Sequence, residues 1–215
     1  MRPISLQAAV ELIPDGASVM IGGFMGVGTP ERLVDELVRQ GKRNLTVIAN
    51  DNALPGIGIG KLISAGAVRK TIASHIGLNP ETQKKMLSAE IEVDLVPQGT
   101  LIERIRAGGF GLGGVLTPTG IGTVVEKGKQ RVEVDGKPYL LETALRADFA
   151  LVQAFLADYI GNLYYALTAR NFNPLMAMAA DTVIVDAENI VPVGVISPDN
   201  VVTPAPVVDY IISHA

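Results

Sequence analysis

The apolar positions of the chain follow two patterns, which predict strands and helices in alternation. Short segments rich in apolar residues predict strands at residues 18–21, 45–49, 68–74, 91–96, 149–155 and 182–185, and at 45–49 both faces are hydrophobic, which is typical of a parallel strand. Between these segments, apolar residues recur every three or four positions, which predicts helices at 5–13, 30–40, 61–64, 79–87, 99–107 and 174–180. This order predicts an α/β fold with an open, mostly parallel sheet and helices on both of its faces.

The segment from residue 108 to residue 142 departs from this alternation. Residues 108–122 are too rich in glycine for a regular element and too long for a tight turn, so we expect a long, packed loop. Whether residues 108–123 line a pocket, contact another subunit or only pack stays open at this point. Two strand-like runs then flank a turn at 135–138, which predicts an antiparallel hairpin. The proline-containing tail after residue 191 is expected to be mostly irregular.

One stretch near the start of the chain joins a strand to a helix through a glycine-rich loop. Four glycines fall between residues 22 and 28, and glycine lets backbone N–H groups approach a ligand closely. Thr29 is a favourable N-cap, and Pro30 suits the first helical position. Such a loop offers unpaired N–H groups to a phosphate, or to an oxygen that becomes negative during a reaction. The residues predicted to bind substrate or cofactor are Phe24, Met25, Gly26, Val27, Gly28, Thr29 and Pro30.

The same stretch resembles a known family signature. The run from Asp15 to Pro30, with Gly22-Gly23-Phe24 at its centre, is similar to the N-terminal signature of the family I coenzyme A transferases. A second run, residues 113–123, is similar to another segment of that family. The resemblance covers nearly the whole chain and is closest to the α subunits of short-chain acyl CoA-transferases of the acetate and acetoacetate type. It implies a fold like that of CoA-transferases and sugar-phosphate isomerases, with CoA or an acyl-CoA as substrate and no permanently bound cofactor.

The resemblance also implies that this chain lacks the catalytic nucleophile. Family I CoA-transferases use a glutamate in a Ser-Glu-Asn-Gly motif to attack the acyl-CoA thioester. Glu188-Asn189 lies between Ala187 and Ile190, so the motif is incomplete and we interpret it as a chance match. We therefore expect no catalytic residue here and a glutamate supplied by a β subunit, in an α2β2 or higher heterooligomer. The enzyme is expected to move CoA from an acyl-CoA such as acetyl-CoA to a short-chain acid such as acetoacetate or butyrate.

Other interpretations of these residues stay open. The loop is also compatible with a purely structural turn, or with a phosphate site in a sugar-phosphate isomerase-like domain that acts alone. Gly26, Gly28 and Asp51 match part of the dinucleotide-binding fingerprint, although Glu31 stands where its third glycine belongs. His75 follows a predicted strand, where open α/β sheets place their ligand crevice, but a single histidine is more often structural.

Composition narrows the class of protein further. At 215 residues the chain fits one domain, 1–215, and its 48% hydrophobic and 19% charged content suits a packed core rather than disorder. With a net charge of −4, the chain lacks the excess of basic residues that is typical of nucleic-acid-binding proteins. Cysteine is absent, and the two histidines, His75 and His214, form no metal-ligand pattern. Because we find neither a signal peptide nor an apolar run of about 18 residues, we expect no membrane partner and a cytoplasmic location.

Overall fold

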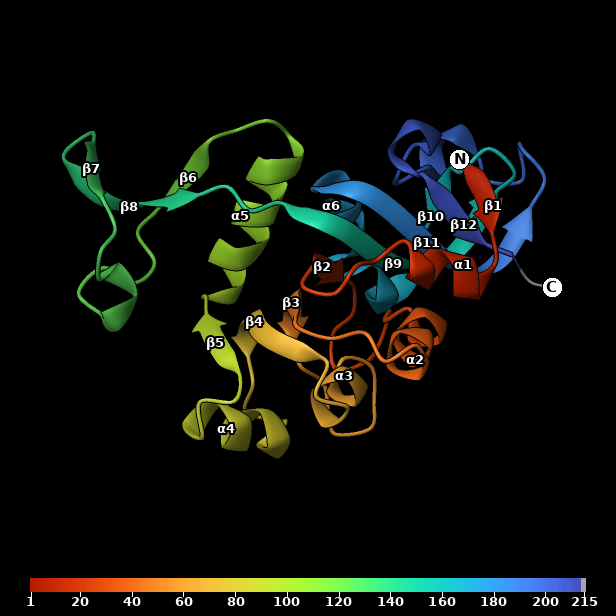
Figure 1. Ribbon diagram of the computed structural model, residues 1–215. Helices are drawn as coiled ribbons and strands as arrows, with labels where there is room; N and C mark the ends of the chain where they lie inside the picture. Colours follow the sequence, from red (N-terminus) through yellow and green to blue (C-terminus); the bar gives the residue numbers. More distant parts are fainter. Residues whose placement is uncertain (214–215) are drawn as a thin grey trace.

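A computed structural model describes residues 1–213, so His214 lies outside the described residues. Most of the strands form one 9-stranded sheet (Figure 1). Its strands are β1 (Arg2–Ile4), β2 (Ser18–Ile21), β3 (Leu45–Asp51), β4 (Val68–His75), β5 (Glu92–Leu95), β9 (Ala147–Asp158), β10 (Leu163–Tyr164), β11 (Ala180–Val191) and β12 (Tyr210–Ile212). The α-helices of the described residues are α1 (Leu6–Glu11), α2 (Glu31–Arg39), α3 (Gly60–Ser64), α4 (Pro80–Leu87), α5 (Gln98–Gly109) and α6 (Asn173–Met178).

The large sheet is almost entirely parallel. Its strand order is β1-β12-β11-β9-β2-β3-β4-β5, with β10 paired to β9. Each pair along this order is parallel, whereas β10 runs antiparallel to β9. Together with the separate antiparallel hairpin described below, this arrangement confirms the predicted fold class. The carboxyl ends of β2, β3 and β4 meet at one edge of the sheet, which is where open α/β sheets bind their ligands.

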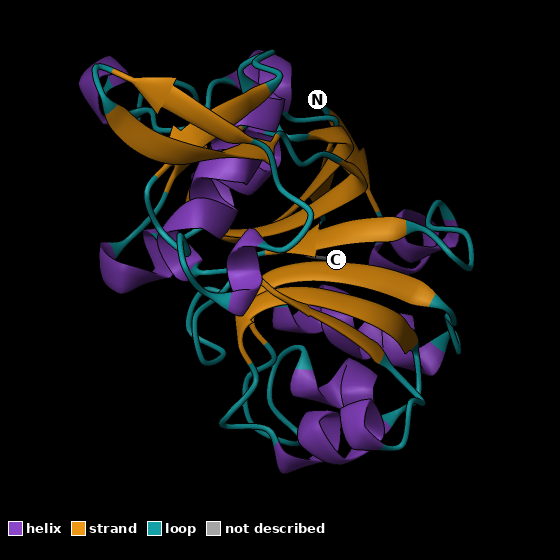
Figure 2. Ribbon diagram, turned by 90° about the vertical axis from the view of Figure 1, so that its left-hand side faces the viewer, coloured by secondary structure: helices purple, strands orange, loops and turns teal. Residues whose placement is uncertain are grey.

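Helices lie on both sides of the large sheet (Figure 2). Successive strand residues point to opposite faces. In β2, Val19 and Ile21 join the apolar cluster of α1, α2 and α3, whereas Met20 belongs to the cluster that contains residues of α5 and α6. The sheet is therefore the middle layer of three. Burial on both faces explains why the central strands β2 and β3 are mostly apolar in the sequence.

Strands β9 and β11 are longer than the sequence predicts. The apolar pattern indicated residues 149–155 and 182–185, but the two strands pair in parallel from Ala147 and Ala180 to Asp158 and Val191. Polar side chains interrupt the pattern, and tertiary contacts satisfy them. The carboxylate of Asp186, for example, accepts a hydrogen bond from Arg32 Nε at 3.0 Å. The predicted end of the strand at residue 185 was therefore wrong, because Arg32 on α2 neutralises the charge of Asp186 and β11 continues through it.

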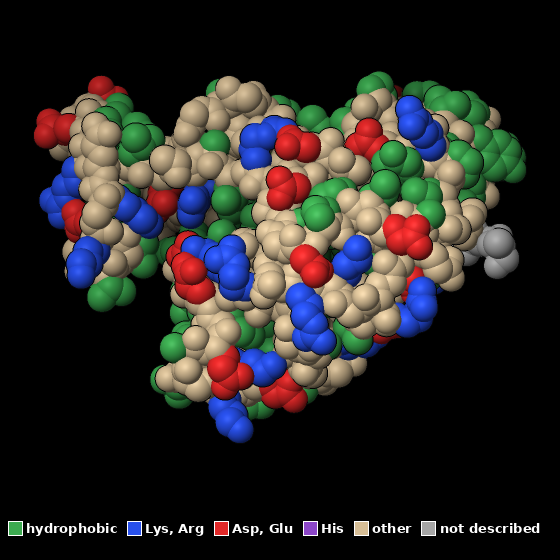
Figure 3. Space-filling model, in the orientation of Figure 1, with side chains coloured by type: hydrophobic (Ala, Val, Ile, Leu, Met, Phe, Trp, Pro, Cys, Tyr) green, Lys and Arg blue, Asp and Glu red, His purple; other side chains and the backbone are tan. Residues whose placement is uncertain are grey.

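The glycine-rich segment contains a strand that the sequence analysis excluded. Strand β6 (Gly114–Thr117) pairs antiparallel with β8 (Lys137–Thr143), and β8 pairs with β7 (Arg131–Val134) in a 3-stranded sheet. The predicted hairpin is confirmed as β7 and β8, but the expectation of no regular element in residues 108–122 was wrong. A Cβ on Gly114 would lie 2.5 Å from the carbonyl oxygen of Glu142, so glycine permits this close pairing. This small sheet stands apart from the body of the molecule in Figure 3.

The tail also contributes to the main sheet. Strand β12 lies between β11 and β1, with Ile211 paired to Val185 on one side and to Pro3 on the other. The sequence analysis missed both short strands, since each has only three residues and its backbone partners are distant along the chain. The two segments nearest the ends of the described chain are thus neighbours in one sheet.

Candidate active site

The predicted glycine loop forms a tight turn at the carboxyl end of β2. Phe24 and Val27 exchange two backbone hydrogen bonds, each 2.9 Å long. The two residues between them, Met25 and Gly26, have φ angles of 50° and 89°. Positive φ at both central positions is typical of a type I′ turn. Phe24, Met25 and Val27 are nevertheless exposed, so the turn presents apolar side chains at the ligand-binding edge of the sheet.

A buried aspartate and a half-buried asparagine, both far along the chain, hold this turn in place. At the end of β3, Asp51 accepts the Met25 N–H at 3.0 Å, which fixes the unusual backbone of that residue. From the other side, Asn171 accepts the Gly23 N–H at 3.1 Å and donates its amide to the carbonyl of Val27 at 2.9 Å. The turn is therefore preorganised by side chains that lie far from it in sequence.

Close packing requires glycine at several positions of the loop. A Cβ on Gly22 would collide with Asn173, one on Gly23 with Thr29, and one on Gly28 with the backbone of Ala169. Most N–H groups of the loop also donate hydrogen bonds to other groups of the protein. Among loop residues 22–29, the N–H groups of Gly26 and Gly28 have no acceptor within the described chain, so these two remain as donors of the loop itself.

The start of α2 differs from the prediction by one residue. Helix α2 begins at Glu31, Pro30 occupies the N-cap position, and no side chain caps the helix. The expected cap by Thr29 was therefore wrong. Thr29 is instead buried, and its hydroxyl lies 2.0 Å from where a Cβ on Gly23 would be. The Thr29 side chain therefore fills the space that a side chain on Gly23 would need.

A pocket of about 200 Å³ opens beside the turn, at the carboxyl edge of the sheet. Its lining comes from the ends of β3 and β4, from the start of α5 and from two loops: Phe24, Met25, Asn50, Asp51, Ser74, His75, Leu78 and Gln98. Of the seven residues predicted to bind ligand, the structure thus brings Phe24 and Met25 to this pocket, while the other five shape the turn behind it. His75 also lines the pocket. It lies opposite Asp51 in the register of the parallel strands β3 and β4.

A chain of amide and hydroxyl groups forms the floor of this pocket. Gln98 Nε2 donates to Asn50 Oδ1 at 2.6 Å, and Asn50 Nδ2 donates to Asp51 at 2.7 Å. Ser74 Oγ donates to the Asn50 carbonyl at 2.7 Å. Gln98 is the first residue of α5, a helix without a side-chain cap, so the positive end of that helix lies at the floor. These groups suit a carboxylate or a carbonyl oxygen that gains negative charge.

Sequence reasoning missed Asn50 and Gln98 as site residues, although a signal for each was present. Asn50 directly follows the apolar run 45–49, and Gln98 follows the run 91–96. Polar residues just after buried parallel strands fall at the carboxyl edge, where ligands bind. No comparable signal marks Asn171, because it follows a short 3₁₀ segment, Leu167–Arg170, rather than a strand of the site.

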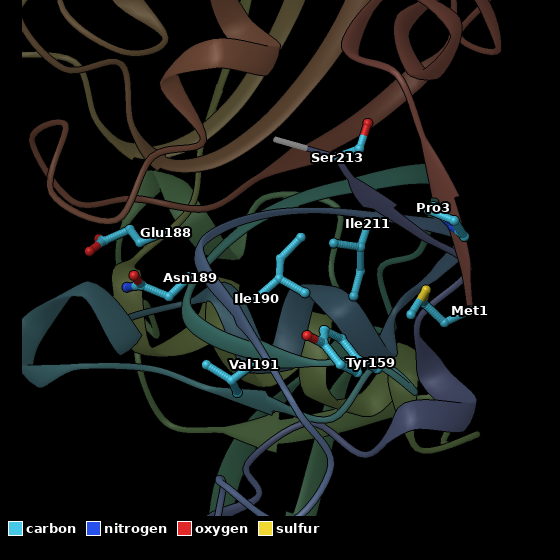
Figure 4. A pocket seen from close by; sticks show the side chains of 9 residues that line it. All are labelled: Met1, Pro3, Tyr159, Glu188, Asn189, Ile190, Val191, Ile211 and Ser213. Carbon is cyan, nitrogen blue, oxygen red and sulfur yellow. The ribbon is translucent and has the colours of Figure 1, made fainter. Parts of the chain in front are cut away.

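Glu188 lies elsewhere. It stands on β11, accepts a hydrogen bond from Gln153 Nε2 at 2.9 Å, and lines a separate groove of about 670 Å³ with Asn189 and Tyr159. Figure 4 shows Glu188 and Asn189 at one end of this groove, and Met1 and Pro3 at the other. The groove shares no lining residue with the pocket beside Phe24. The interpretation of Glu188-Asn189 as a chance match stays a prediction.

Neither a metal centre nor a membrane span is evident in the part of the chain that the structure describes. Among residues 1–213, no group of three or more His, Cys, Asp or Glu side chains is placed to hold a metal ion. None of the described helices combines the length and the apolar content needed to cross a bilayer. Lys and Arg side chains are interspersed with Asp and Glu on the face shown in Figure 3.

Comparison with known proteins identifies the family. The family model "Coenzyme A transferase" matches residues 4–214. The chain is 58% identical to the acetate CoA-transferase subunit alpha of Escherichia coli K12 over 209 residues, which are 97% of this chain and 95% of that protein. It is 54% identical to the acetoacetyl-CoA:acetate/butyrate CoA transferase alpha subunit of Clostridium acetobutylicum, over 93% of this chain and 92% of that protein. The chain belongs to the coenzyme A transferase family, as the resemblance predicted.

Solved structures agree with this assignment. An acyl-CoA transferase from Escherichia coli O157:H7, determined as a thioester complex with CoA, superposes with a TM-score of 0.86 at 26% identity. The match covers 98% of this chain but only 46% of the other, so this chain spans about half of that enzyme. Glutaconate coenzyme A-transferase from Acidaminococcus fermentans shares the fold, with a TM-score of 0.82 at 19% identity over 99% of this chain and 76% of that one.

The geometry also bears on the dinucleotide interpretation. In that interpretation Asp51 would bind a ribose hydroxyl. The structure instead directs its carboxylate to the Met25 and Ala53 N–H groups and to the Asn50 amide. A buried carboxylate that already accepts these bonds has little capacity left for a ribose. The family match favours the CoA-transferase interpretation over this alternative.

The hydrogen bonds between Asn171 and the turn lead to a first testable prediction. Asn171→Gly keeps backbone freedom at a residue whose φ is 17° and removes both side-chain bonds to the turn. We expect the free energy of unfolding to fall by about 1–2 kcal/mol, and the Gly23 amide to exchange hydrogen faster. Asn44→Gly is the control, because Asn44 also has a positive φ, 59°, but is exposed and away from the turn. Equal melting and exchange in the two variants would show that Asn171 does not hold the turn.

Proposed function

We propose that this chain is the α subunit of a heteromeric CoA-transferase that moves CoA from an acyl-CoA, such as acetyl-CoA, to a short-chain acid, such as acetoacetate or butyrate. The observation that carries the proposal is the small pocket at the carboxyl edge of the sheet, with amide donors on its floor and apolar side chains on its wall. This arrangement suits a short acid, whose carboxylate is polar and whose tail is not. The α-subunit relatives that match almost end to end support it.

The proposed chemistry needs a second chain. A glutamate of the β subunit attacks the thioester carbonyl of the acyl-CoA, giving an acyl-glutamyl anhydride and CoA thiolate. The thiolate then attacks the glutamyl carbonyl, which gives a glutamyl-CoA thioester and releases the first acid. The second acid passes through the same two steps in reverse order and leaves as the new acyl-CoA, so the glutamate is restored. Each attack places negative charge on a carbonyl oxygen, and we propose that Gln98, Asn50 and the N-terminus of α5 stabilise it.

Other parts of this proposal follow from the family rather than from the pocket. The seven loop residues from Phe24 to Pro30 are proposed to contribute to the CoA site or to its wall. CoA is proposed to come and go as a substrate, without any permanently bound cofactor. The β partner would complete an α2β2 or higher assembly. The single domain 1–215 and a cytoplasmic location stay predictions.

Reconstitution tests the proposal directly. The chain is purified alone, and also together with a β chain that contains the Ser-Glu-Asn-Gly motif, and each is given acetyl-CoA and butyrate. We expect butyryl-CoA only from the mixture, and none when the glutamate of the motif is replaced by glutamine. Glu188→Ala in this chain should leave the rate of the mixture near its original value. Transfer by the chain alone at the rate of the mixture would refute the proposal, and turnover of a sugar phosphate by the chain alone would favour the isomerase-like alternative.

A further inference from the structure

The pocket beside the turn has both apolar and polar lining residues. Met25 comes from the turn after β2, and Leu78 from the loop between β4 and α4. The polar lining residues are Asn50, Asp51, Ser74, His75 and Gln98, of which Asn50, Ser74 and Gln98 are joined by hydrogen bonds. Each side-chain amide has two N–H donors, and one donor of Asn50 and one of Gln98 are used within the floor. A bound acid would take the remaining donors with its carboxyl oxygens and place its carbon chain against the apolar residues.

The size of the pocket limits what it encloses. Its volume of about 200 Å³ lies below the range of roughly 300–1,000 Å³ that is usual for sites of drug-sized ligands. The acyl group of a short acid fits such a space, whereas the pantetheine and nucleotide parts of CoA do not. Each added carbon must therefore find room between the floor and the wall.

Both wall residues stand on rigid backbone. The Met25 N–H is held by Asp51, at a φ of 50°. The loop that carries Leu78 is held by Asn79, which is fully buried, accepts the Thr82 N–H at 3.0 Å and donates to the carbonyl of Asn52 at 3.1 Å. Because the backbone is held at both positions, the lengths of the Met25 and Leu78 side chains set how far the apolar wall reaches into the pocket.

We propose that Met25 and Leu78 set the length of the acyl chain that the enzyme accepts. This inference rests on the proposed function of the pocket. Shortening either side chain deepens the apolar end of the pocket and leaves the polar floor intact. The carboxyl end of the substrate then binds as before, and the added space admits further methylene groups.

Two variants test the inference in the assembled enzyme. Leu78→Ala shortens a side chain that is 37% exposed, so the fold is little affected. Met25→Gly removes the other side chain at a position whose positive φ glycine adopts readily. For each, kcat/KM is measured with acetate, butyrate and hexanoate as acceptors and acetoacetyl-CoA as donor, so that every transfer gives a new acyl-CoA and releases acetoacetate. We expect the hexanoate-to-acetate ratio to rise about tenfold or more, the scale of one or two methylene groups in an apolar pocket.

A matched control and a reverse variant make the result decisive. Leu87→Ala makes the same change on α4, at a side chain that is 83% exposed and does not line the pocket, and should leave all ratios unchanged. Leu78→Phe narrows the pocket and should lower the butyrate-to-acetate ratio. If an active Leu78→Ala variant has the same hexanoate-to-acetate ratio as the original enzyme, the inference is overturned, but the CoA-transferase function still stands. Failure of the original assembled enzyme to transfer CoA to any of the acids would refute the proposed function itself.

Discussion

Gly28→Ala is expected to destabilise the protein strongly and to inactivate the assembled transferase. Gly28 has a φ of 78°, and an added Cβ would lie 2.5 Å from the carbonyl oxygen of Ala169 and 2.8 Å from the side-chain amide of Asn171. The positive φ and the overpacking together cost about 2–5 kcal/mol. Relief of the clash requires the turn to move away from Asn171, and a displacement of about 1 Å at a catalytic wall lowers the rate roughly a hundredfold.

The control for this variant separates backbone strain from the clash. Gly41 has a similar φ, 68°, but a Cβ there would have nothing within 4 Å, and it follows α2 away from the pocket. Gly41→Ala should therefore cost only the strain, about 1–2 kcal/mol, and should leave transfer of CoA unchanged. Thermal melting and steady-state assays with the β chain present compare the two. If Gly28→Ala melts and turns over like Gly41→Ala, the close packing at Gly28 has no functional role.

Removal of the Asp51 carboxylate is the second change with a large expected effect. Asp51 is only 6% exposed. Its oxygens accept the Ala53 N–H at 2.8 Å, the Met25 N–H at 3.0 Å and the Asn50 amide at 2.7 Å. Asp51→Ala leaves these donors without an acceptor, at about 1–3 kcal/mol for each one that stays buried and unpaired. Since Met25 and Asn50 both line the pocket, we expect kcat/KM to fall roughly a hundredfold.

Two further variants show whether this loss arises at the pocket. Asp51→Asn keeps one carbonyl oxygen, which can still accept the Met25 and Ala53 N–H groups, so its activity and melting should lie between those of Asp51→Ala and the original protein. Asp148→Ala removes a carboxylate that accepts the N–H and hydroxyl of Ser18 at the opposite edge of the sheet. It should lower stability with little effect on kcat/KM. If Asp148→Ala and Asp51→Ala lose activity equally, the loss in Asp51→Ala reflects lower overall stability and not a change at the pocket.

The sequence by itself determined the elements and the family. The strand at 18–21 is found as predicted, and the helix predicted at 79–87 extends from Pro80 to Leu87, with Asn79 as its cap. These features depend on contacts within a few residues, namely the apolar run and the side chain that caps the first turn, so a local pattern is sufficient to predict them. The glycine signature likewise located the turn at the edge of the sheet.

Only the tertiary structure decided how the site is assembled. Asn50 and Gln98 are 48 positions apart in sequence and meet within hydrogen-bond distance, and Asn171 reaches Gly23 from 148 positions away. The same holds for β1 and β12, which are too short to be recognised without each other. It also holds for Gly28, where a Cβ would collide with the backbone of Ala169, 141 positions further along the chain. Such pairings depend on the three-dimensional order of the strands, and no periodicity along the chain encodes that order.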